Sequence, residues 1–170
     1  MSQLVGVHGI GNEYLGRHQI LNRWAPALSD GLQWAVGHPS ANQPDLDVAF
    51  YGHLFRSAAE TTEKGPAEGR AAAELADLDA DELGELTEAV QEIVPPAGLA
   101  NAEAATDKAL MWLPVPAQRL VGAVERHFPR ASGIAVLSVL RQVGRYLRDA
   151  QIKAEIDQIT AAPLLAAPPS

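Results

Sequence analysis

The sequence predicts an α/β fold in which a parallel β–α–β unit is followed by a mostly helical region. Two short apolar runs, at residues 4–8 and 47–51, flank a long stretch with helical periodicity. This order is typical of two parallel strands joined by a helix. Beyond residue 56 the chain becomes rich in Ala, Glu and Leu, and no further strand pattern occurs.

These patterns also predict the domain organisation. We expect one partial α/β domain over residues 1–160, made of a βαβ core at 1–56 and a helical insertion at 57–160. Residues 161–170 hold three prolines and four alanines, which predicts a disordered tail. A chain of 170 residues is long enough to bury a substantial core.

The first predicted strand runs from Leu4 to His8. It is short, rich in valine and without polar alternation, which favours a strand buried on both faces. The next four residues, Gly9 to Asn12, are types that form tight turns.

A helix is predicted from His18 to Val36, where apolar residues recur every three or four positions. Pro26 lies within it and should kink it or mark a new start. The second strand is predicted at Asp47–Tyr51, closed by Gly52.

The remaining segments are expected to be helical. The Ala-, Glu- and Leu-rich stretch Ala67–Val94 predicts one or two helices, with Asp81 capping the second and Pro95 ending it. Trp112 lies in an apolar connector broken by prolines, and we expect it to pack in the core rather than to form a lid. Further helices are expected at residues 117–127 and 132–150, and residues 151–160 are expected to continue the second of these helically.

Composition limits the classes of function. The net charge of −8 argues against a protein that binds DNA over its whole surface, so no nucleic-acid partner is expected. The chain lacks cysteine, which excludes disulfides and cysteine nucleophiles. No leader peptide or membrane-spanning run is recognised, so we expect a cytoplasmic protein.

The charge is unevenly distributed. Residues 57–110 carry 13 acidic against three basic side chains, whereas residues 111–150 carry six arginines against two acids. Arg141, Arg145 and Arg148 share one helical face. That face is either a solvated surface, neutralised in part by the acidic stretch, or a docking surface for an acidic partner.

The hexapeptide VHGIGN at Val7–Asn12 resembles the His-Gly turn of bacterial α/β-hydrolase-like proteins. In that family a backbone N–H just after the His-Gly pair helps to form the oxyanion hole. The resemblance implies that the N–H of Ile10, or else that of Gly11, is an oxyanion donor. It also implies that His8 and Gly9 form the turn, and that His8 is not a catalytic base. The order of the following elements fits the same family over residues 3–160.

The family's nucleophile is missing. After residue 160 the resemblance implies a β-branched strand leading into Gly-x-Ser-x-Gly, but no such pentapeptide occurs in this chain. We therefore expect a truncated protein, inactive alone, whose first strand has an open edge. Self-association or a complementing chain at that edge is expected. The alternative is a non-catalytic interaction module that uses the edge or the arginine face.

Two other interpretations of the turn and the histidines are weaker. A phosphate loop would need Lys-Ser or Lys-Thr where Arg17 and His18 follow Gly16, and Glu13 would repel phosphate. The five histidines lack the paired spacing of a metal site. We expect no cofactor and no metal.

Overall fold

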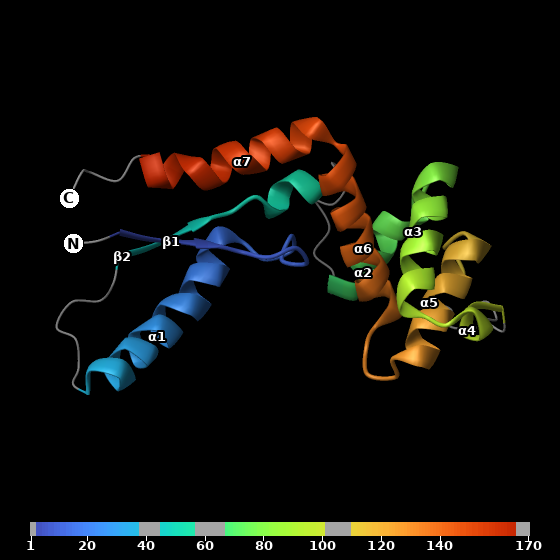
Figure 1. Cartoon of the computed structure of the whole chain (residues 1–170), viewed down its shortest axis with the longest axis horizontal. Coiled ribbons are helices and arrows are strands. Elements are labelled where there is room, and N and C mark those ends of the chain that lie inside the picture. The colour runs from blue at the N-terminus through green and yellow to red at the C-terminus, as the bar shows by residue number, and fades with distance from the viewer. Residues whose placement is uncertain (1–2, 38–44, 57–66, 101–109, 166–170) are drawn as a thin grey trace. The chain divides into compact units, whose positions relative to one another are not determined.

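The computed structural model describes residues 3–37, 45–56, 67–100 and 110–165. The chain divides into two compact units. The sheet unit comprises residues 1–56 and 149–170, and the helical unit comprises residues 57–148. The predicted α/β class is confirmed in its coarse form, because a parallel pair of strands is accompanied by helices throughout the described residues (Figure 1).

The sheet unit contains the predicted βαβ arrangement. Strand β1 (Gln3–Val7) pairs in parallel with β2 (Asp45–Ala49), from Gln3 opposite Asp45 to Val7 opposite Ala49. Helix α1 (Arg17–Val36) joins the strands and continues through Pro26 as one element. Figure 1 shows α1 and α7 (Ala150–Leu165) on opposite sides of the strands, and both helices contact the sheet.

The two strands differ in how well they are covered. Val48 and Ala49 of β2 are buried, whereas Leu4 and Val7 of β1 are 41% and 54% exposed. Side chains alternate between the faces of a strand, so Leu4 shares the face of Gly6, on which the Trp24 ring of α1 packs. Leu4 and Val7 therefore lie on opposite faces, and β1 is incompletely covered on both.

The second strand and the end of the chain correct two boundaries. β2 lies two residues before the predicted 47–51, and Tyr51 instead precedes the 3-10 helix η1 (Gly52–Phe55). The expected disordered tail is wrong for residues 161–165, because α7 extends to Leu165 with Pro163 inside it. Residues 166–170 are outside the described part of the chain.

The predicted insertion at 57–160 is also too long. The helical unit ends at Arg148, and α7 belongs to the sheet unit. Asp149 separates the two helices because its carboxylate accepts hydrogen bonds from the amides of Gln151 and Ile152 at 2.9 and 3.1 Å. This side-chain cap starts a new helix where the sequence pattern had suggested continuity.

The helical unit has its own hydrophobic core. Its helices are α2 (Ala67–Ala76), α3 (Ala80–Ile93), α4 (Pro96–Ala100), α5 (Val115–His127) and α6 (Gly133–Arg148). Among the residues that the structure describes, twelve buried apolar ones form the core: Leu75, Leu86, Val90, Val94, Leu110, Leu113, Ala117, Leu120, Val121, Ala123, Val124 and Leu137. No described helix combines the length and apolarity needed to cross a membrane.

Two local predictions in this unit are wrong. The cap of α3 is Asp79, whose carboxylate accepts a hydrogen bond from the Glu82 amide at 2.8 Å, and not Asp81. Trp112 was expected in the core but is 47% exposed. Its neighbours Leu110 and Leu113 are buried instead, so the tight turn that they anchor directs Trp112 outward.

Candidate functional site

The predicted oxyanion turn follows β1 directly. Residues His8 to Gly16 connect β1 to α1, with Gly11 at φ 87°. This left-handed backbone conformation favours glycine. Ile10 is half-buried and Gly11 is exposed, so the middle of the turn lies at the surface of the sheet unit.

His8 ties the ends of the two strands together. The residue is 2% exposed, and its ring stacks on the ring of Tyr51 with centroids 4.0 Å apart. The amide of Tyr51 donates to Nε2 of His8 at 3.1 Å, and the Tyr51 hydroxyl donates to the His8 carbonyl. These contacts hold the chain just after β2 against the chain just after β1.

The same hydrogen bonds define the tautomer of His8. An amide can only donate, so Nε2 must be unprotonated and Nδ1 must carry the hydrogen. Nδ1 lies 2.9 Å from the carbonyl oxygen of Gly9 and therefore donates to it. Both ring nitrogens are engaged, which leaves His8 no nitrogen with which to act as a base.

The Gly9–Ile10 peptide is oriented through its carbonyl. Besides His8, the side-chain amide of Asn12 donates to the Gly9 oxygen at 3.0 Å. The described chain contains no cis peptide bond, so the N–H of Ile10 points away from the Gly9 carbonyl. Among the described residues, no hydrogen bond from the Ile10 amide is found. The geometry therefore presents this N–H as a fixed donor.

The loop after the turn is held by Arg56. Its Nε donates to the carbonyl of Glu13 at 2.5 Å, and its Nη2 donates to the carbonyl of Leu15 at 3.0 Å. The guanidinium carbon lies 5.9 Å from the centroid of the Phe50 ring. Gly52 packs so closely on Glu13 that a Cβ there would lie 2.8 Å from the Glu13 Cα.

None of the described serines belongs to this turn, so the turn itself provides no serine nucleophile. Ser29 lies on α1 and its hydroxyl donates to the Ala25 carbonyl. Ser132 and Ser138 belong to the helical unit, where Ser138 donates to Glu74 at 3.0 Å. The turn thus offers the Ile10 N–H as a hydrogen-bond donor, but it contains no serine.

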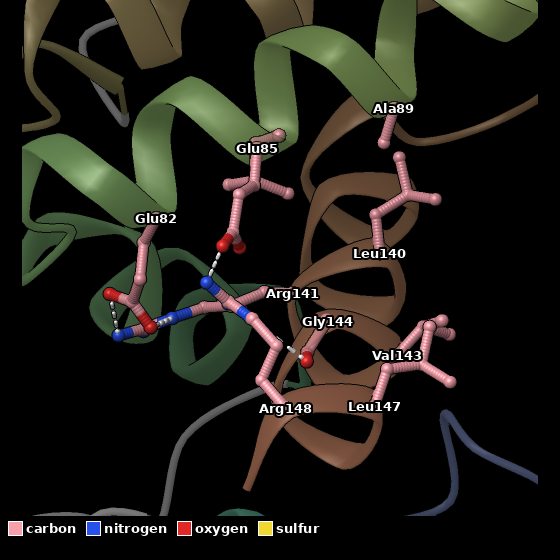
Figure 2. Close-up of a pocket in the computed structure, with 10 residues that line it drawn as sticks. Glu82, Glu85, Ala89, Leu140, Arg141, Val143, Gly144, Leu147 and Arg148 are labelled. Carbon is pink, nitrogen blue, oxygen red and sulfur yellow. Dashed lines mark hydrogen bonds and ion pairs between the residues drawn. The ribbon is translucent and has the colours of Figure 1, made fainter.

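The arginine face in the helical unit is partly neutralised by acidic residues. Arg141 makes two hydrogen bonds to Glu82, at 2.9 and 2.7 Å, and Arg148 pairs with Glu85 (Figure 2). This is the neutralisation by the acidic stretch that the sequence suggested. Two of the three arginines predicted to share the face therefore already have carboxylate partners.

A hollow of about 160 Å³ lies between α3 and α6, beside these ion pairs. Figure 2 shows Ala89 and Leu140 at one end and Val143 and Leu147 at the other. Its walls are mainly apolar, and its charged rim is internally paired. We find no cluster of three or more metal-ligating side chains within the described ranges.

Sequence reasoning identified His8, Gly9, Ile10 and Gly11 but missed the residues that hold them. Tyr51 could have been found, because the carboxyl ends of two parallel strands meet at one edge of a sheet. No sequence pattern indicated a role for Arg56.

Comparisons with protein-family models, curated proteins and solved structures found no match to this chain.

Proposed function

We propose that this chain is part of an α/β-hydrolase-like protein of the serine esterase, lipase or peptidase type. In this proposal, residues 8–11 supply one side of the oxyanion hole and the nucleophile comes from a segment outside this sequence. The observation that carries the proposal is the Gly9–Ile10 peptide, whose carbonyl accepts hydrogen bonds from His8 and Asn12 while its N–H is left to donate.

The incomplete cover of β1 supports the proposal. Within the described ranges, β1 pairs with β2 on one side only, and its Leu4 and Val7 side chains are 41% and 54% exposed. A further parallel strand would pair with the other edge of β1, and its side chains would lie beside Leu4 on one face and Val7 on the other. Its carboxyl end would then lie beside the His8–Gly11 turn, because parallel strands end at the same edge.

The expected chemistry is acyl transfer. A serine at the end of that strand would attack a substrate carbonyl, and the carbonyl oxygen would gain negative charge. An N–H donor aimed at this oxygen lowers the barrier by about 2.7–4 kcal/mol. The Ile10 N–H would be one donor, and the second would come from the residue after the nucleophile.

The gene provides a direct test. The DNA downstream of the codon for Leu165 is translated in all three frames. The proposal expects a β-branched strand followed by Gly-x-Ser-x-Gly in one of them. The absence of this pattern from every frame would contradict the proposal.

A second candidate function is a non-catalytic interaction module that pairs through the edge of β1. The exposure of Leu4 and Val7 favours it, and so does the absence of charged residues from this strand. The arginine face supports this function less, since Arg141 and Arg148 are ion-paired. Light scattering tests this second function: it expects a stable oligomer of the chain alone, and a monomer at every concentration would contradict it.

A further inference from the structure

We infer that Arg56 is a positioning residue that fixes the Ile10 N–H through a relay of hydrogen bonds. Nη2 of Arg56 donates to the Leu15 carbonyl, the Leu15 amide donates to the Asn12 carbonyl, and the Asn12 side chain donates to the Gly9 carbonyl. Each of these three distances is 3.0 Å. The last acceptor belongs to the same peptide group as the Ile10 N–H.

An arginine suits the first position of this relay. Its planar guanidinium carries donors in a fixed fork, and here two of them reach two different carbonyls, those of Glu13 and Leu15. The Phe50 ring beneath the guanidinium adds a cation–π contact that favours its position. A lysine has a single charged nitrogen and no planar fork, so it cannot reproduce this arrangement.

At Glu13 the loop depends on Arg56, because the Glu13 side chain itself makes no stabilising hydrogen bond among the described residues. Glu13 is 4% exposed, and its buried Oε2 has no hydrogen-bond partner among the described residues. Burying an oxygen without a hydrogen-bond partner costs free energy, so the Glu13 side chain destabilises this conformation of the loop. The stabilising contacts at Glu13 are made by its backbone, with Arg56 at the carbonyl and Gly52 against the Cα.

The significance of the relay for catalysis rests on the proposed function, but its existence does not. If Arg56 is lost, the Leu15 carbonyl loses its donor and the 12–15 turn is free to rearrange. Asn12 then no longer holds the Gly9 carbonyl in one orientation. The Ile10 N–H would sample several directions, and a preorganised donor would become a mobile one.

The test uses nuclear magnetic resonance on the isolated chain, without substrate. We expect Arg56→Ala to accelerate hydrogen exchange of the Leu15 amide at least tenfold and to shift the Asn12 side-chain and Ile10 amide resonances. The Tyr51 amide, bonded to His8 outside the relay, should change less than twofold. Arg17→Ala is the matched control, because Arg17 pairs with Asp47 in the same unit but does not reach the relay.

Chemical rescue sharpens the test. Methylguanidinium added to Arg56→Ala should slow Leu15 exchange again, whereas methylammonium should not. Equal acceleration at Leu15 and Tyr51 would show general destabilisation and would overturn the inference, as would no acceleration at Leu15. If Arg56→Ala does not fold, Arg56→Lys takes its place, with faster Leu15 exchange expected and unchanged Leu15 exchange overturning the inference. A chain without hydrolase activity would still give these results, so the two proposals fail separately.

Discussion

Replacing Gly52 by alanine should loosen the loop that follows the His8–Gly11 turn. A Cβ at position 52 would lie 2.8 Å from the Glu13 Cα and 2.9 Å from Cζ of Phe50, whereas ordinary contacts begin at 3.4 Å. Glu13 must therefore retreat by about 0.6 Å, which is 3.4 minus 2.8. Gly52 does not have a left-handed φ, so the effect is one of packing. Such overpacking destabilises by about 1–3 kcal/mol.

The matched control is Gly31→Ala. Gly31 lies within α1, and a Cβ there would meet nothing within 4 Å. Alanine favours a helix over glycine by about 0.8–1.0 kcal/mol, so this variant should be more stable than the original chain.

Urea unfolding followed by circular dichroism measures both changes. Because the chain has two compact units, one two-state transition is not assumed. Hydrogen exchange at Val48 and Ala49 assigns the effect to the sheet unit. The reasoning is refuted if Gly52→Ala is as stable as the original chain while Gly31→Ala is stabilised as expected.

Four further substitutions test other contacts. Tyr51→Phe should destabilise the sheet unit by about 1–3 kcal/mol, because the buried His8 carbonyl loses its hydroxyl donor. Leu137→Ala should destabilise the helical unit by about 2–5 kcal/mol, since this side chain is fully buried. Arg148→Ala should cost at most about 1 kcal/mol, because its ion pair is exposed. Arg141→Ala should cost about 3 kcal/mol or more, since its partner carboxylate is largely buried and is left without its counter-charge.

The same unfolding assay checks these values, and each has an outcome that contradicts it. Tyr51→Phe should not alter the exchange of amides in the helical unit. Val139→Ala, on the exposed side of α6, controls for Leu137→Ala and should change stability little. Equal effects of Arg141→Ala and Arg148→Ala would show that burial does not determine the strength of these ion pairs.

Local sequence patterns predicted which strands and helix occur in the sheet unit, but they placed the boundaries of these elements less accurately. Residues 4–8 formed a recognisable strand because they are apolar and β-branched, and the pattern 18–36 matched α1 closely. The second strand ends at Ala49 and not at Tyr51, because the Tyr51 amide donates to the His8 ring instead of to a neighbouring strand. A contact between residues distant in the sequence leaves no local pattern.

The end of the domain was misjudged for similar reasons. Proline was taken as a sign of disorder after residue 160, yet Pro163 lies within α7. The single carboxylate of Asp149 divides one apparent helix into two that belong to different units. Apolar periodicity continues across this boundary, so only the capping geometry reveals it.

The residues of the candidate site were likewise only partly predictable from the sequence. The glycines and His8 could be identified from one hexapeptide, because a tight turn needs those residue types. The role of Asn12 follows from its contact with the Gly9 carbonyl, and that of Arg56 from two carbonyls distant in the sequence. These contacts depend on the fold, and no local pattern in the sequence indicates them.

Labelling with a fluorophosphonate probe tests the central claim most directly. The 170-residue chain and the full product of its natural reading frame are each treated with the probe, and labelled residues are located by mass spectrometry. The account predicts no label on the chain alone and a labelled serine outside these 170 residues in the full product. A label on a serine of this chain, or an unlabelled full product, would contradict it.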